Sequence, residues 1–227
     1  MKNSNRRVGS KKIRIWDSPV RIFHWSLALL FFISWISAEI GGNAMQYHMW
    51  SGYTILGLVL FRILWGIVGS ETARFSHFMR GPVAALAYAR AWFKPGYRAP
   101  LGHNPLGGWS VAALLLTLAF QALTGLFSND DIANEGPLYH LVSKATSDLF
   151  SILHSGSFNV LLALVALHIA VIAVYLLKHR ENLVKPMLTG DKLVDEDIHQ
   201  PRQSSVWLAV VLALVVAGLV YGIVNLL

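Results

Sequence analysis

The sequence contains no cysteine and few charged residues. None of its 227 residues is cysteine, 14% are charged and 55% are hydrophobic. The lack of cysteine excludes disulfides, thiolate nucleophiles, iron–sulfur clusters, covalently attached c-type haem and cysteine zinc sites. A soluble globular domain carries about 25% charged residues, so this chain would aggregate unless its apolar surface faced lipid. The composition therefore favours an integral membrane protein.

Five apolar runs are long enough to cross about 30 Å of hydrocarbon as helices. They cover residues 20–38, 48–68, 108–127, 149–177 and 206–227, approximately. The first run is too long for a cleaved signal peptide and no clear cleavage pattern follows it. The sequence therefore predicts an all-α integral membrane protein. Its domain of residues 20–190 is a four-helix transmembrane bundle, to which one extra C-terminal transmembrane helix is added.

The polar segments between the runs predict how the chain sits in the membrane. Residues 1–19 form a basic segment, residues 191–205 a polar linker, and residues 81–93 an amphipathic helix or surface loop in the headgroup layer. Acidic residues are scarce, and the net charge is +7. The Lys and Arg residues gather in alternate loops, whereas the opposite loops hold only Lys144. This pattern predicts a cytoplasmic N-terminus and a periplasmic C-terminus, and it favours a membrane surface over nucleic acid as the partner of the basic charge.

Four of the nine histidines lie in or at the ends of predicted spans, where ionisable side chains are costly and usually functional. They are His24, His48, His154 and His168. Because successive helices alternate in direction, His48 and His154 are expected at the outer depth, and His24 and His168 at the cytoplasmic depth. His154 and His168 are 14 residues apart. That spacing places them on one helix face, about 21 Å apart.

Two pairs of imidazoles at two depths suit two stacked porphyrins, each iron taking one neutral imidazole from either side. Closed axial positions favour electron transfer over oxygen binding. Three alternatives remain: buried histidines hydrogen-bonded to neighbouring helices, zinc sites that would lack ligands, or a proton relay, which usually includes acidic residues within the spans. His140 is also 14 residues before His154, but it lies in an acidic outer loop, which favours a surface histidine.

Small and basic residues supply further candidates around these histidines. Gly52, one turn after His48, and Gly125 would let a flat ring approach a helix closely, although small residues also serve helix packing. Arg21, three residues before His24, and Arg62 enter the cytoplasmic layer, where they could bind haem propionates or anchor the helix ends. Lys144 is the only Lys or Arg able to serve an outer propionate.

Several segments together resemble bacterial cytochrome b561 and the related b-type cytochrome subunit of nickel–iron hydrogenases. They are residues 16–25 (WDSPVRIFHW), 48–53 (HMWSGY) with 61–62 (FR), 102–108 (GHNPLGG) and the histidines of the fourth run. The resemblance covers roughly residues 13–190. It implies a four-helix core that binds two b haems, with His24, His48, His154 and His168 as axial ligands. It also implies electron transfer in the bacterial inner membrane between a quinone pool and a redox partner.

The leading interpretation is a dihaem electron carrier with no catalytic side chain of its own. Whether it acts as a quinone oxidoreductase stays open. Its protein partner could be a periplasmic cytochrome c, docked on the acidic outer loops, or an oxidoreductase subunit. The alternative function is that of a membrane anchor in a larger oxidoreductase such as a hydrogenase; a haem-free transporter or scaffold is the remote one. The fifth run lacks histidine, so we expect it outside the haem core, against the core, a partner or a second copy in a homodimer.

Overall fold

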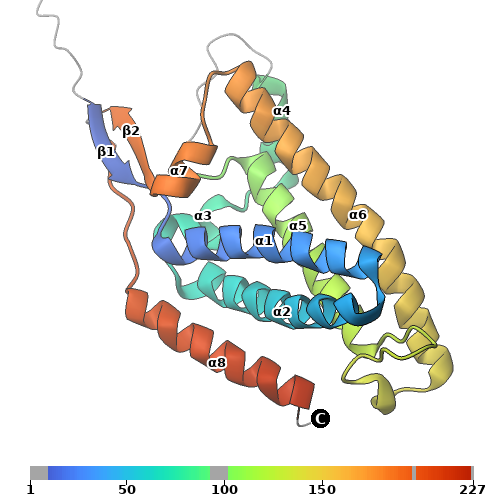
Figure 1. Ribbon diagram of the computed structural model, residues 1–227. Helices are drawn as coiled ribbons and strands as arrows, with labels where there is room; N and C mark the ends of the chain where they lie inside the picture. The colour runs from blue at the N-terminus through green and yellow to red at the C-terminus, as the bar shows by residue number, and fades with distance from the viewer. Residues whose placement is uncertain (1–9, 93–101, 196–197, 226–227) are drawn as a thin grey trace, which may run out of the picture.

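The computed structural model describes residues 10–92, 102–195 and 198–225. Within them, five helices are long and apolar enough to cross a membrane (Figure 1). They are α1 (Ser18–Ile40), α2 (Met45–Val68), α5 (Pro105–Phe127), α6 (Lys144–Leu177) and α8 (Val206–Asn225). Each occupies one of the five predicted intervals. Helix α6 starts earlier than predicted because its first turns are polar, and Ser143 caps it by accepting a hydrogen bond from the Thr146 amide.

Shorter elements connect the long helices. These are α3 (Phe75–Phe78), α4 (Pro82–Trp92) and α7 (Val184–Thr189), three 3-10 turns, η1 (Gly42–Ala44), η2 (Glu71–Ala73) and η3 (Tyr139–Leu141), and two strands, β1 (Ser10–Arg14) and β2 (Asp191–Asp195). The amphipathic segment predicted at residues 81–93 is helical as α4, and its last residue, Phe93, lies outside the described residues.

The start of α1 is fixed by Asp17, whose carboxylate also joins α1 to α2. One oxygen, Oδ1, accepts the Val20 amide at 2.8 Å, which satisfies one of the free amides of the first turn. The other, Oδ2, accepts the indole N–H of Trp65 at 2.9 Å. Trp65 is fully buried. A polar residue at the edge of an apolar run thus sets both the beginning of α1 and its packing on α2.

An apolar cluster occupies the middle of the bundle. Phe31 of α1, Ile55 and Val59 of α2, Leu118 of α5 and Leu161 of α6 are buried together. Leu161 is midway between His154 and His168 on α6. The cluster therefore separates the bundle into two halves, one on each side of its centre.

A small two-stranded sheet is added to the predicted helical bundle. Strand β1 pairs antiparallel with β2, with Arg14 opposite Asp191. Lys12 and Arg14 form ion pairs with the Asp191 carboxylate at 3.1 and 3.0 Å. Ile13 is buried beneath the sheet. Opposite charges and a buried isoleucine thus bring the N-terminal segment and the start of the linker together.

The bundle consequently has two distinct ends (Figure 1). We call the end that carries β1, β2 and α7 the sheet end. The opposite end, which carries η1 and the segment of residues 128–143, is called the loop end.

Helix α8 packs on α2 from outside the bundle. It buries Ala209, Val216 and Val220, and Val216 and Val220 share a cluster with Leu56 of α2. Residues just before α8 are tied to the end of α2. The Ser204 amide donates to the Ser70 hydroxyl at 2.9 Å, and the Arg202 amide donates to a Glu71 carboxylate oxygen at 2.9 Å. The segment that leads into α8 is therefore held to the core.

Candidate functional site: two histidine pairs

The structure brings together two pairs of histidines, one in each half of the bundle. At the loop end, the ring centres of His48 on α2 and His154 on α6 are 6.0 Å apart. At the sheet end, the ring centres of His24 on α1 and His168 on α6 are 6.4 Å apart. These are the pairs that the depth argument predicts. His140 lies in η3 and belongs to neither pair.

Backbone carbonyls orient both imidazoles of the loop-end pair. Nδ1 of His48 lies 2.9 Å from the Ser34 carbonyl oxygen, and Nδ1 of His154 lies 2.9 Å from that of Gln121. A carbonyl oxygen only accepts, so each Nδ1 carries the proton and donates it. Each Nε2 is then left unprotonated, which is the state in which imidazole binds a metal.

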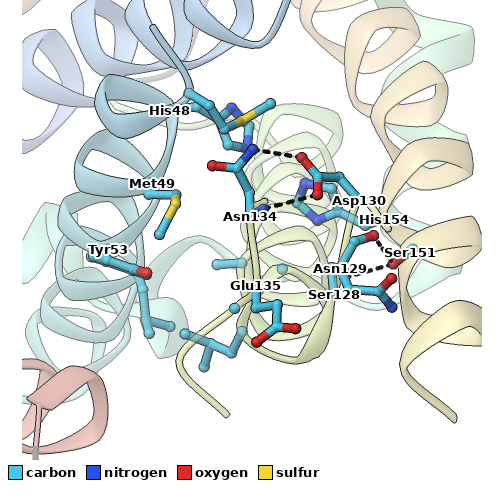
Figure 2. A pocket seen from close by; sticks show the side chains of 17 residues that line it. His48, Met49, Tyr53, Ser128, Asn129, Asp130, Asn134, Glu135, Ser151 and His154 are labelled. Carbon is cyan, nitrogen blue, oxygen red and sulfur yellow. Dashed lines mark hydrogen bonds between the residues drawn. The ribbon is translucent and has the colours of Figure 1, made fainter. Parts of the chain in front are cut away.

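A cavity of about 220 Å³ adjoins the loop-end pair. Figure 2 shows His48 and His154 on its lining, from α2 and α6. Gly52 also lines it, and a Cβ added there would have no atom within 4 Å. At Gly125 of α5, by contrast, a Cβ would lie 3.0 Å from Cε1 of the His154 ring. Gly52 therefore leaves open space on the helix that carries His48, and Gly125 makes room for the His154 ring.

The mouth of this cavity is acidic. Asp130 and Glu135 line it, together with Asn129 and Asn134. Hydrogen bonds from the side chain and backbone of Asn134, and from the backbone of Ile132 and Ala133, lower the pKa of Asp130 well below its usual value. Asp130 is therefore a carboxylate at neutral pH.

Lys144 is not brought to this cavity. Its ammonium group forms an ion pair with Asp131 at 2.5 Å and another with Asp148. No Lys or Arg is among the described residues that line the cavity. The charge of Lys144 is thus already balanced by two neighbouring carboxylates.

The sheet end, in contrast, contains the buried cation Arg62 and the partly buried cation Arg21. Arg62 of α2 is only 3% exposed, with its guanidinium carbon 5.1 Å above the Phe75 ring. Arg21 donates from Nη1 to the Thr189 carbonyl at 3.1 Å. Nη1 of Arg62 and Nε of Arg21 are buried without a hydrogen-bond partner among the described residues. Buried donors of this kind are costly unless a ligand or water satisfies them.

His103 is a further residue of the sheet end, in the loop that precedes α5. Its ring lies against those of Trp16 and Phe78, at centroid distances of 4.7 and 4.5 Å. Burial, and then the charge of Arg62, lower its pKa to about 3; His168 and His24 contribute in the same direction. His103 is therefore neutral and adjacent to the sheet-end pair. The signal for it is its place in the GHNPLGG motif.

The two pairs fit axial coordination of a porphyrin iron. Imidazole–metal bonds of about 2.0 Å, one on each side of a metal, place the ring centres about 6.4 Å apart. The separations of 6.0 and 6.4 Å are close to this value. The described residues contain no group of three or more His, Cys, Asp or Glu able to hold a metal ion without a porphyrin. Paired histidines at two levels of an apolar helical bundle define the class of membrane b-type cytochromes.

Comparison with known proteins agrees with this class. The sequence pattern of the family "Prokaryotic cytochrome b561" matches residues 15–190. The chain belongs to this family, whose membership implies b-type haem and electron transport in a membrane.

Two curated relatives carry the name "Probable Ni/Fe-hydrogenase B-type cytochrome subunit". The protein from Rhizobium leguminosarum bv. viciae is 25% identical over 223 residues, which cover 84% of this chain and 93% of the relative. That from Bradyrhizobium diazoefficiens is 25% identical over 150 residues, covering 54% and 60% respectively. No solved structure matches this chain.

Proposed function

We propose that this protein is a dihaem b-type cytochrome that carries electrons across the bacterial inner membrane between a quinone pool and a redox partner. The observation that carries the proposal is the presence of two histidine pairs, at ring separations of 6.0 and 6.4 Å, in opposite halves of one apolar bundle. Two such sites in series provide a path through the low-dielectric core, whereas a lone buried histidine pair would not.

Each pair would hold one haem by its axial positions, His48 with His154 and His24 with His168. When bound, a b haem supplies a one-electron iron couple. The carbonyls of Ser34 and Gln121 hold the loop-end imidazoles in the tautomer that binds iron. The apolar cluster around Leu161 keeps water out of the region between the pairs.

The basic residues of the sheet end would bind haem propionates. The unpaired donors of Arg21 and Arg62 are suited to a carboxylate, since charge-assisted hydrogen bonds are the strong ones, and His103 offers a further nitrogen nearby. Lys144 remains a candidate at the loop end, but it would have to leave Asp131 and Asp148 to bind a propionate there. Gly52 would provide space beside the loop-end haem.

In the proposed orientation the sheet end faces the cytoplasm and the loop end the periplasm. The sheet end and its connections hold most of the basic residues, and the loop end holds Asp130, Asp131, Glu135 and Asp148 against a single Lys144.

The names of the relatives support a second candidate, the membrane-anchor cytochrome of a larger oxidoreductase such as a hydrogenase. The two candidates share the haem sites and differ in the partner. Affinity purification of the full chain from native membranes separates them, because stoichiometric co-purification of a large metal-containing subunit favours the anchor.

Haem content per chain tests the proposal. A pyridine haemochrome assay, referred to protein mass, should give two b haems per chain. A ratio of one at full occupancy contradicts the two-pair arrangement. A chain without b-type absorption bands would be a haem-free transporter or scaffold instead.

A further inference from the structure

An apolar groove of about 660 Å³ runs between α8 and the α1–α2 pair. Its walls include Ile22 and Phe23 of α1, Phe61 of α2, and Ala213 and Ala217 of α8. Helix α8 contacts α2 through Ala209, Val216 and Val220. The alanines at 213 and 217 are too short to reach α1 and remain exposed. The groove therefore follows from small side chains on the face that α8 turns toward α1.

Tyr53 connects this groove with the loop-end cavity, since it lines both. Its ring packs against the cluster that contains Leu56 and Val220. Figure 2 shows its side chain beside the cavity that His48 and His154 line. No described residue forms a hydrogen bond with its hydroxyl group. One end of the groove thus has a phenol hydroxyl with no hydrogen-bond partner among the described residues.

Further polar atoms line the same groove at this level. Trp50 and Thr54 of α2 flank Tyr53, and Tyr221 and Asn225 come from the last turns of α8. The Thr54 hydroxyl and the Asn225 amide are occupied by carbonyls of their own helices. The other groove-lining residues of α8 are apolar. The groove is therefore mostly apolar, with most of its polar side chains at the loop end and Ser18 at the other end.

We propose that this groove binds a membrane quinone, with the isoprenoid tail along α8 and the quinone ring at Tyr53. The inference rests on the proposed function, which requires a quinone, and adds where it binds. A long apolar tail matches the wall of alanine, isoleucine and phenylalanine, and a quinone carbonyl matches the free hydroxyl of Tyr53. A phospholipid would also cover the wall, and its ester carbonyls are acceptors too, so the test includes competition by a phospholipid. The ring would lie next to the cavity that His48 and His154 line.

Photolabelling of the purified full-length protein tests the site directly. The probe is a ubiquinone analogue with a diazirine in its isoprenoid tail. We expect labelled peptides from α8 around residues 213–217 and from α1 around Ile22. Excess unlabelled ubiquinone should abolish the labelling, and excess phosphatidylethanolamine should leave it unchanged. Equal displacement by the phospholipid, or labelling elsewhere on the chain, overturns the proposal.

Two sets of variants sharpen the test. The double variant Ala213→Phe/Ala217→Phe fills the groove and should reduce labelling about tenfold or more. Its matched control, Val211→Phe/Val215→Phe, alters the opposite and exposed face of α8 and should label normally. Tyr53→Phe removes one hydrogen bond and should weaken quinone binding about five- to tenfold. Unchanged binding in both Tyr53→Phe and the filled-groove variant overturns the proposal.

Haem content, measured on the same samples, separates this inference from the proposed function. Two haems per chain without groove labelling leave the dihaem cytochrome intact and remove the quinone site. Groove labelling in a chain that binds no haem supports the site and removes the dihaem cytochrome.

Discussion

The loop-end and sheet-end histidine pairs differ in what the protein fixes around them. At the loop end, carbonyls of Ser34 and Gln121 hold both imidazoles, and the cavity mouth is acidic. At the sheet end, Nδ1 of His24 has no partner among the described residues, and the charge of the buried Arg62 acts on His103, which also interacts with both histidines of the pair. Hydrogen bonds fix the orientation of the two imidazoles at the loop end, whereas a buried positive charge distinguishes the sheet end. The two histidine pairs are otherwise similar.

This difference predicts unequal haem potentials. Ferric haem carries one more positive charge than ferrous haem, so a buried cation favours the reduced form. The sheet-end haem should therefore have the higher midpoint potential and the loop-end haem the lower.

The largest effect should follow removal of one ligand from each pair. His154→Ala should eliminate the loop-end haem and His168→Ala the sheet-end haem, because each leaves one axial position empty. Haem content should fall from two to one per chain in both variants. Redox titration should then give a single step, at the higher potential in His154→Ala and at the lower in His168→Ala. The reverse order would contradict the charge assignment. Loss of the same step in both variants would contradict the pairing itself.

A smaller and one-sided effect is expected at Gly125. In Gly125→Ala the new Cβ meets the His154 ring at 3.0 Å, so the imidazole has to move from its position at the Gln121 carbonyl. Perturbing such ligand orientation typically costs 10- to 100-fold in metal affinity. Apo-protein titrated with hemin should therefore lose about that factor at the loop end alone. Gly156→Ala is the matched control, because a Cβ there has no atom within 4 Å. Equal affinities in both variants would show that the ring position is not set by Gly125.

At the sheet end, the matching test removes a charge near the histidine pair instead of moving an imidazole. Arg62→Met removes the buried cation and should lower the midpoint potential of the sheet-end haem by about 60 mV, which is a tenfold change for a one-electron couple. Arg62→Lys keeps the charge and should retain most of the potential, although it loses the planar fork. Spectroelectrochemical titration of both variants gives the answer. A change in the midpoint potential of the loop-end haem alone would show that Arg62 acts on that haem and not on the sheet-end haem.

The smallest effect should come from truncation after Gln203. None of the residues of α8 lines the loop-end cavity, and its contacts with α2 replace contacts that lipid would make about as well. The truncated chain should keep two haems and an unchanged difference spectrum. Loss of either haem from an inserted chain would show that α8 belongs to the cofactor core.

Much of this arrangement is predictable from the sequence. Hydropathy is sufficient for the spans, because bilayer thickness sets their length. Alternating helix direction then assigns the depth of His24, His48, His154 and His168, so both pairs follow without any tertiary information. These predictions depend only on spacing along the sequence, because a helix that spans the membrane places each of its residues at a definite depth.

Other features depend on contacts that spacing does not encode. The hydrogen bonds that orient His48 and His154 are accepted by backbone carbonyls, which every residue has. Lys144 is the only Lys or Arg that the sequence predicts on the outer side, but it forms ion pairs with Asp131 and Asp148. His103 lies in a loop, and its ring packs against Trp16 and Phe78, which are distant from it in the sequence. The pairing of β1 with β2 joins segments about 180 residues apart, and their charged residues resemble ordinary membrane-surface anchors.

That pairing also constrains how the protein is made. Strand β1 is among the first described residues to leave the ribosome, but its partner β2 follows the whole of α6 and α7. The sheet can close only after every helix that carries one of the paired histidines has been synthesised. Until then, Arg14 and Lys12 lack Asp191, and Arg21 lacks the carbonyl of Thr189. The sheet end is therefore completed only after the four-helix core has been synthesised.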